Sequence, residues 1–222
     1  MTEEYFYHYT DRTAAKAIFI SGKILPSLAA NGDAAHGDGV YLTTLDPSLG
    51  REVVKNNNWN GLAEGIDKKM DCYFEILMPS NKVRRGKEKR DIQVHNGALK
   101  LAEYKWSLKN WKGELLVTQH FMVSSQGEAA RRLADKMGRY TLVGNILLYD
   151  VIPVYKHDEE EAYLYRSKHG SWCIGPCAGD DKCSLSQLSN NVGHPSPPKI
   201  DPWKYHDNGW MEDVTLKVYP CF

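Results

Sequence analysis

Three closely spaced segments decide how the chain begins to fold: Tyr7-His8-Tyr9-Thr10, Ser21-Gly22-Lys23-Ile24-Leu25-Pro26-Ser27 and Gly37-Asp38-Gly39-Val40-Tyr41-Leu42-Thr43. The first segment is aromatic and predicts a strand, and Asp11 after it supplies a side-chain oxygen that can cap a helix. Apolar residues then recur at helical spacing as far as Gly22, which is placed to end that helix. The third segment predicts a glycine-rich loop that leads into a second strand.

Short strands and few helices are expected along the rest of the chain. A strand is predicted over Cys72–Met78, and the apolar, partly β-branched run Glu114–Val123 predicts a central strand. Beyond about residue 138, Tyr, Trp, Pro and Gly become frequent, and strand-like pieces alternate with turns. We therefore expect an α+β fold, with residues 1–137 forming an antiparallel sheet core with short helices and residues 138–222 a small, mostly β module.

The composition is that of a folded protein without a dominant charge. The 222 residues include 28 Lys plus Arg and 28 Asp plus Glu, and 42% of them are hydrophobic. A net charge of zero removes the long-range field that attracts a phosphate backbone, which argues against non-specific nucleic-acid binding. No stretch approaches the roughly 18 consecutive apolar residues of a membrane helix, and the first residues are acidic and polar. We expect a cytoplasmic protein with no membrane partner.

The cysteines do not predict a disulfide framework or a metal site. There are five of them, an odd number, and reduced thiols are expected in a chain without a signal peptide. Cys173, Cys177 and Cys183 cluster, but their spacing lacks the paired C-x-x-C geometry of a zinc ribbon, and only His169 lies close by as a fourth ligand. We predict that no structural metal is bound.

Several common nucleotide-binding and hydrolase motifs are absent from the sequence. It contains no Walker-type loop, no G-x-G-x-x-G opening a helix, no H-E-x-x-H and no G-x-S-x-G. What remains is an ordered set of four landmarks, His8-Tyr9-Thr10, Ser21–Ser27, Gly37–Thr43 and Pro47, over about 40 residues. Their order resembles the opening of the small toxin-type ADP-ribosyltransferases, within the His-Tyr-Glu branch that includes diphtheria-type toxins and the poly(ADP-ribose) polymerases. Glu114, at the head of an apolar run, matches the third residue of that branch.

This resemblance implies a split antiparallel β-sheet and an enzyme that uses NAD as co-substrate. Cleavage of the nicotinamide–ribose bond develops positive charge at the sugar carbon, and a carboxylate stabilises this oxocarbenium-like state. By resemblance, Glu114 takes that role, Tyr41 stacks on nicotinamide, and His8 with Thr10 holds the adenosine-side ribose. The implied NAD site also includes Tyr9, Gly39, Leu42 and Thr43. ADP-ribose would pass to a protein or nucleic-acid acceptor, or to water.

The sequence departs from the family pattern on the helix after Tyr41. Glu52 stands about eleven residues after Tyr41, where the polymerase type has a second Tyr, so stacking from the second side has to come from elsewhere. The assignment of Glu114 rests on its position before an apolar run, and the other acidic candidates, in order of preference, are Glu103, Asp91 and Glu64.

Each of these residues also has a purely structural interpretation. A His at a strand end is commonly a satisfied hydrogen-bonding residue, a Tyr in a strand is commonly part of a core, and a Glu before a strand is commonly solvated. A catalytically silent module of the same fold, binding NAD, ADP-ribose or a partner protein, is therefore the alternative hypothesis.

Two further features have open roles. The run Lys82–Arg90 contains six Lys or Arg residues, which predicts a solvated loop or hairpin tip. The alternative is a surface for a nucleic-acid acceptor. The aromatic residues after residue 138 are expected mainly to fill the core of the small module, because a small β module needs large side chains to bury enough area.

Overall fold

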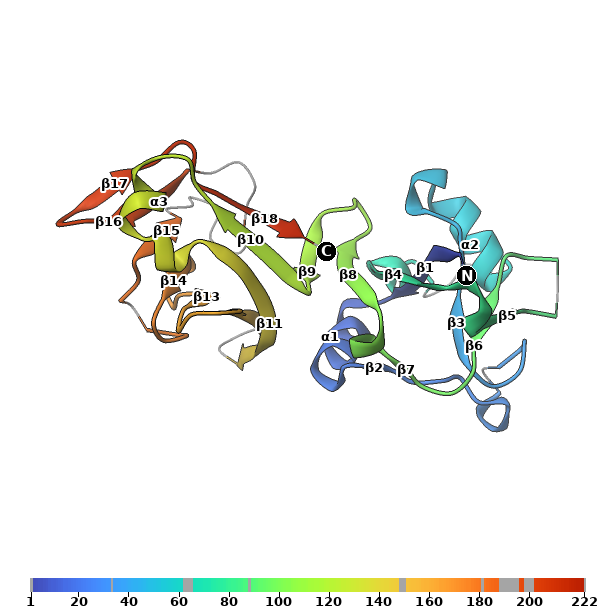
Figure 1. Ribbon diagram of the computed structural model, residues 1–222. Helices are drawn as coiled ribbons and strands as arrows, with labels where there is room; N and C mark the ends of the chain where they lie inside the picture. Colours follow the sequence, from blue (N-terminus) through green and yellow to red (C-terminus); the bar gives the residue numbers. More distant parts are fainter. Residues whose placement is uncertain are drawn as a thin grey trace. The chain divides into compact units, whose positions relative to one another are not determined.

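The computed structural model describes residues 2–32, 34–61, 66–87, 89–147, 151–180, 182–187, 196–197 and 202–221. The chain forms two compact units, Met1–Leu116 and Val117–Phe222, and antiparallel strands dominate both (Figure 1). The division lies earlier than the expected 137/138 boundary, because β10 (His120–Ser124) pairs with β11 (Gly138–Leu147) and with β18 (Lys217–Cys221).

The described part of the first unit contains three small antiparallel sheets. One has the strand order β1-β4-β8-β9, another the order β3-β6-β5, and the third joins β2 to β7. The strands are β1 (Glu3–Thr10), β2 (Lys23–Ile24), β3 (Val40–Leu42), β4 (Cys72–Pro79), β5 (Val83–Arg85), β6 (Gln93–His95), β7 (Leu99–Lys100), β8 (Lys105–Asn110) and β9 (Leu115–Thr118). The helices are α1 (Arg12–Ser21) and α2 (Arg51–Trp59), with short 3-10 turns η1 (Ala29–Asn31), η2 (Pro47–Leu49), η3 (Lys68–Met70), η4 (Ser80–Lys82) and η5 (Leu101–Glu103).

Helix α1 begins and ends at the residues that the sequence indicated. Asp11 accepts a hydrogen bond from the backbone N–H of Ala14 at 2.7 Å, which satisfies one of the orphan donors of the first turn. Gly22 ends the helix in the left-handed conformation, at φ 66°. The strand that precedes α1 buries Phe6 against the core, whose central members include Phe74 and Ile76 of β4.

The apolar run Glu114–Val123 is two strands in different sheets, where a single central strand was expected. β9 lies beside β8 in the first unit, whereas β10 belongs to the sheet of the second unit. The chain leaves the first sheet at Gln119, whose carbonyl accepts a hydrogen bond from the backbone of Leu142. Three polar residues, Thr118-Gln119-His120, interrupt the apolar run at this point. The sequence does not show that the pieces on either side enter different sheets, because both are suited to a buried strand.

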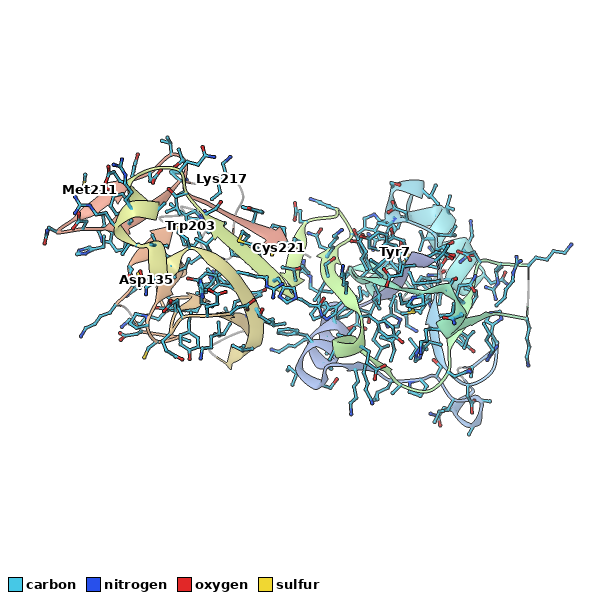
Figure 2. All side chains as sticks on the ribbon, viewed as in Figure 1. Tyr7, Asp135, Trp203, Met211, Lys217 and Cys221 are labelled. Atoms are coloured by element: carbon cyan, nitrogen blue, oxygen red, sulfur yellow. The ribbon has the colours of Figure 1, made fainter. Side chains whose placement is uncertain are left out.

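The second unit is built around one nine-stranded antiparallel sheet. Its strand order, β17-β16-β15-β14-β13-β12-β11-β10-β18, follows the chain from β10 to β17, and the last strand returns beside β10. Large aromatic side chains are completely buried, among them Trp172, Trp203 and Tyr155, as expected for this module. Trp203 is labelled in Figure 2. Its other elements are α3 (Glu128–Arg132), η6 (Ala134–Lys136), β12 (Val151–His157), β13 (Tyr163–Arg166), β14 (Trp172–Gly175), β15 (Leu185–Gln187), β16 (Trp203–His206) and β17 (Trp210–Glu212).

A buried carboxylate ties α3 to the far end of the sequence. The residue before the helix, Gly127, gives no side-chain cap, and Asp213 takes over by accepting from the Ala129 N–H at 3.0 Å. Asp213 also accepts from Ser125 Oγ at 2.8 Å and from the N–H and Oγ1 of Thr215 at 2.9 and 2.6 Å. Burial opposes ionisation of Asp213, but these hydrogen bonds outweigh it and lower the pKa of the carboxyl to about 2.

Candidate functional site

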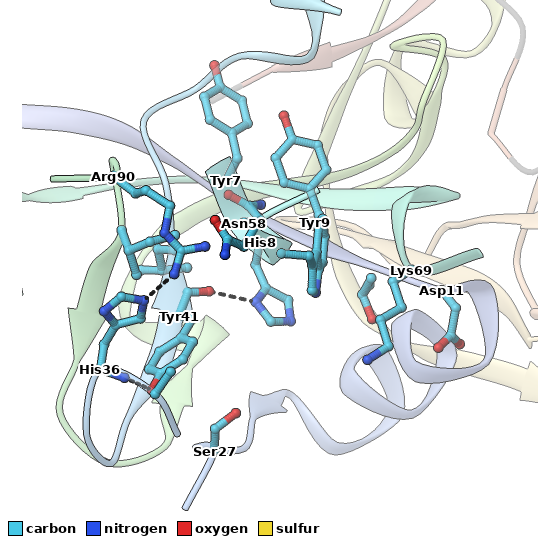
Figure 3. A pocket seen from close by; sticks show the side chains of 16 residues that line it. Tyr7, His8, Tyr9, Asp11, Ser27, His36, Tyr41, Asn58, Lys69 and Arg90 are labelled. Atoms are coloured by element: carbon cyan, nitrogen blue, oxygen red, sulfur yellow. Dashed lines mark hydrogen bonds between the residues drawn. The ribbon is translucent and has the colours of Figure 1, made fainter. Parts of the chain in front are cut away.

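A cavity of about 560 Å³ opens in the first unit where β1, β3, α2 and the chain before β6 meet (Figure 3). Five of the residues expected at an NAD site line it. These are His8, Tyr9, Thr10, Tyr41 and Leu42. Segments far apart in the sequence thus contribute to one concave surface, as a small-molecule site requires.

Backbone hydrogen bonds fix the two strands that carry His8 and Tyr41. The N–H of Tyr7 donates to the Thr43 carbonyl at 2.8 Å, and the N–H of Thr43 donates to the Tyr7 carbonyl at 3.1 Å. This isolated bridge joins β1 to the chain just after β3. Thr43 itself is completely buried and lies outside the lining, so its place in the site is structural.

The imidazole of His8 has a defined hydrogen-bonding polarity. Its Nδ1 lies 3.1 Å from the Tyr41 carbonyl oxygen, which can only accept, so Nδ1 carries the proton (Figure 3). Burial lowers the pKa of His8, and the bond to Tyr41 opposes this shift without cancelling it, so the ring is neutral near pH 7. In that tautomer, Nε2 is a hydrogen-bond acceptor.

The ring of Tyr41 is held at its hydroxyl end by the loop that precedes it. The hydroxyl accepts from the His36 N–H at 2.8 Å and donates to the Gly37 carbonyl at 3.0 Å. The His36 ring meets the Tyr41 ring edge to face, with centroids 5.5 Å apart. Because both hydrogen bonds of the hydroxyl and the contact with the His36 ring hold the phenol in place, the face of the Tyr41 ring is available as a rigid aromatic surface in the cavity.

Gly39 positions this loop without lining the cavity. Its φ of +149° is a conformation that side chains rarely adopt, and a Cβ there would lie 2.5 Å from Val94 Cγ1 and 2.6 Å from the His95 carbonyl oxygen. Backbone hydrogen bonds of 2.9 and 3.1 Å also join Gly39 to Ser27 in the landmark before it. The glycine therefore allows β3 to approach β6 closely.

Tyr9 lines the cavity, but its hydroxyl is hydrogen-bonded within the protein. The Tyr9 hydroxyl donates to the Leu45 carbonyl at 2.8 Å, and its ring packs with those of Tyr7 and Tyr73. Burial raises the pKa of the Tyr9 phenol well above its usual value, so it stays protonated. Trp59 at the end of α2 packs against the same cluster and also lines the cavity.

The cavity is also lined by two cationic side chains, Arg90 and Lys69, which are not part of the family landmarks. Arg90 donates through Nη1 to the Asn57 carbonyl at 3.1 Å, and its Nη2 lies 3.3 Å from His36 Nε2. Asp11 is the one carboxylate among the lining residues, and it is engaged as the cap of α1. The excess of positive charge suits an anionic ligand.

Glu114 does not line the cavity. It closes the turn between β8 and β9, where Asn110 Nδ2 donates to its carboxylate at 2.6 Å and its own N–H donates to Asn110 Oδ1 at 2.9 Å. Asn110 lies opposite Cys72 on β4, and Cys72 lies opposite Thr10 on β1. Glu114 is therefore three strands from the cavity wall, a separation of about 14 Å at about 4.8 Å per strand.

The three alternative carboxylates have different surroundings. Glu103 is exposed and pairs with Lys100 at 3.4 Å, and Glu64 lies outside the described residues. Asp91 stands in the chain between two lining residues, Arg90 and Ile92, but does not itself line the cavity.

Asp91 is held by several donors. Its Oδ2 accepts from Thr43 Oγ1 at 2.9 Å and from the N–H and Oγ1 of Thr44 at 2.7 and 2.8 Å, and its Oδ1 accepts from Gln93 at 3.0 Å. Burial opposes its ionisation, but the hydrogen bonds lower the pKa of Asp91, so the group is a carboxylate.

The described residues hold no group of three or more His, Cys, Asp or Glu arranged to bind a metal ion. No disulfide joins any of the five cysteines, all of which the structure describes, and Cys173 is buried against Ser186 Oγ. In the part of the chain that the structure describes, no helix has both the length and the apolar character needed to cross a membrane.

Comparison of the chain with protein-family models, with curated proteins and with solved structures gives no significant match. Sequence reasoning missed Lys69 and Trp59, which belong to no landmark. Arg90 was visible only as the end of a basic run, whose simplest interpretation was a solvated loop.

Proposed function

We propose that the first unit binds NAD in this cavity and breaks the nicotinamide–ribose bond, passing ADP-ribose to a macromolecular acceptor or to water. The observation that carries the proposal is the meeting of His8 and Tyr41 in one cavity, with the imidazole bonded to the Tyr41 backbone. The proposal includes an ADP-ribosyltransferase-like split sheet. Its support is that β1 and β3 belong to different sheets and are joined at Tyr7 and Thr43.

The size and charge of the cavity agree with a dinucleotide. A volume of about 560 Å³ falls within the range of roughly 300 to 1,000 Å³ typical of cofactor sites. Arg90 and Lys69 supply positive charge for a pyrophosphate, and a guanidinium can bind phosphate oxygens through two parallel N–H bonds.

The hydrogen-bonding polarity of the wall supports the roles that we propose for the side chains. His8 Nε2, an acceptor in the neutral tautomer, would receive a ribose hydroxyl. Tyr41 would present its ring to the nicotinamide. Trp59, on the helix that carries Glu52 in place of the expected second Tyr, is the candidate for a second aromatic contact.

The carboxylate role is assigned to Asp91 in place of Glu114. Thr43, which donates to Asp91, is two residues from Tyr41, so the two side chains leave the strand on one face about 7 Å apart. Glu114, by contrast, is separated from β1 by the two strands β4 and β8. In this proposal Asp91 stabilises the positive charge that develops at the ribose carbon when nicotinamide leaves.

Release of free nicotinamide from NAD tests the proposal directly. The wild-type protein should release it, Asp91→Asn should lower the rate at least a hundredfold, and Glu114→Gln should leave it within a fewfold of wild type. Because Asp91 also bonds Thr43 and Thr44, the thermal stability and ADP-ribose affinity of Asp91→Asn must be measured alongside. Absence of nicotinamide release by the wild-type protein refutes the enzymatic proposal.

A second candidate function is a silent module that binds NAD or ADP-ribose. It is favoured by the engagement of Asp91 in four hydrogen bonds and by the position of Glu114 outside the lining. It predicts that NAD and ADP-ribose raise the Tm without turnover, since a ligand that binds the folded state alone stabilises it. Turnover of NAD by the wild-type protein excludes this alternative.

A further inference from the structure

The basic run of the sequence forms an exposed hairpin on the sheet that carries Tyr41. It covers η4, β5 and the connection from β5 into β6. Lys82, Arg85, Lys87 and Lys89 are all exposed, and none makes an ion pair with another described residue. Between residues 82 and 90, six cationic side chains stand against one Glu, so the local charge is strongly positive although the chain as a whole is neutral.

Strand register places this hairpin beside the cavity. Tyr41 on β3 lies opposite Val94 on β6, and Val94 lies opposite Arg84 on β5. The three residues form one row across the sheet, with Arg84 about 10 Å from Tyr41 at two strand spacings. Arg84 Nη2 also donates to the His36 carbonyl at 3.1 Å, on the loop that holds the Tyr41 hydroxyl. A chain bound along β5 would therefore lie two strands from Tyr41 and next to the loop that holds its hydroxyl.

We infer that this hairpin binds the phosphodiester backbone of a single-stranded nucleic acid, which is the acceptor of ADP-ribose. The inference rests on the proposed function. Lys82 ends η4, Arg84 and Arg85 lie on β5, and Lys87 and Lys89 follow in the connection to β6, so the cations succeed one another along the hairpin and form the kind of positively charged track that binds a single-stranded backbone. An unpaired base can turn toward the aromatic wall of the cavity, whereas a base within a duplex is stacked and hidden.

The transfer step balances without a further reactant. The bond between the ribose carbon and the nicotinamide nitrogen breaks, and its electron pair leaves with neutral nicotinamide. A lone pair on a base nitrogen then forms the new bond to the same carbon, and the proton displaced from that nitrogen passes to solvent. Water takes the place of the base when no strand is bound, so nicotinamide release does not depend on the hairpin.

The test is binding of labelled DNA and RNA single strands of about 12 nucleotides to the full chain, followed by fluorescence anisotropy at several salt concentrations. The test variant combines Lys82→Gln, Arg85→Gln, Lys87→Gln and Lys89→Gln, and leaves Arg84 and Arg90 in place. A matched control removes one Arg and three Lys from other exposed positions of the same unit, as Arg12→Gln, Lys23→Gln, Lys105→Gln and Lys112→Gln.

We expect the test variant to bind the strand on the order of ten- to a hundredfold more weakly at low salt, and the control to bind within about threefold of wild type. The salt slope of the test variant should fall by up to about 3, at about 0.7 per lost phosphate contact. Equal binding by the test variant, or tighter binding of polyglutamate than of the strand, overturns the inference. Nicotinamide release distinguishes failure of this inference from failure of the proposed NAD cleavage. If the wild type and the variant both release nicotinamide but neither binds the strand, only the nucleic-acid inference fails.

Discussion

Replacing Asp213 by Asn should destabilise the second unit by about 2 to 3 kcal/mol at neutral pH. The pKa of about 2 in the folded protein, against about 3.9 for Asp in an unfolded chain, corresponds to about 2.6 kcal/mol. The size is physically reasonable, because the carboxylate is 7% exposed and accepts four hydrogen bonds. An amide keeps the shape but turns one acceptor into a donor, so two of the four donors lose their partner.

The sign of the pH dependence gives the sharper check. Because the folded pKa lies below the unfolded value, the carboxylate stabilises fully above about pH 4, and this contribution is lost as the pH falls through about 2. Urea unfolding of wild type and Asp213→Asn should therefore differ at pH 7 and converge near pH 2, with hydrogen exchange assigning the change to residues 117–221. Asp207→Asn is the control: its 3.5 Å pair with Arg132 is on the surface and should be worth less than about 1 kcal/mol. A difference that persists undiminished at pH 2 would refute the reasoning.

The remaining expectations concern the cavity of the first unit. Gly39→Ala should weaken NAD binding at least tenfold by calorimetry, because its Cβ would lie 2.5 Å from Val94 Cγ1; Gly97→Ala, where φ is +69° but nothing lies within 4 Å, tests backbone strain alone. NAD affinity should be constant above about pH 6.5 and fall below it, because protonation removes the acceptor on His8 Nε2; an affinity that rises on acidification contradicts this. Trp59→Leu should lower NAD affinity by about 1 to 3 kcal/mol if the indole stacks on a ring of the ligand, and unchanged affinity in a folded variant removes that contact.

Local signals predicted the early elements well because the determinants there are local. Asp11 caps α1 through its own side chain, and Gly22 ends the same helix. Two landmark residues, His8 and Tyr41, line one cavity because their strands are joined within a few residues of both, whereas Gly39, Thr43 and Glu114 lie outside the lining. The missing side chain of Gly39 allows β3 to pack closely against β6, because a Cβ at this position would clash with Val94 and His95.

Local sequence signals could not predict which strands pair when those strands are far apart in the sequence. The run Glu114–Val123 has the composition of one buried strand, yet Gln119 separates β9 from β10, which belong to different sheets. The division of the chain at residues 116 and 117, and not at 137, follows from that change of partner. Arg90 was likewise hidden, because a basic run predicts exposure and gives no sign that its last member points to a cavity.

The same limitation applies to the choice between Glu114 and Asp91 as the carboxylate of the proposed site. A Glu before an apolar run matches the family pattern in sequence, but the match does not say how many strands stand between that Glu and the cavity. Here two strands, β4 and β8, lie between β1 and β9, and they separate Glu114 from Thr10. Asp91 follows a different route, since β6 pairs directly with β3 and thereby brings the residues just before β6 to the end of the Tyr41 strand. The paired variants Asp91→Asn and Glu114→Gln therefore compare topology with sequence pattern as guides to catalysis, and opposite rankings of their nicotinamide release support opposite conclusions.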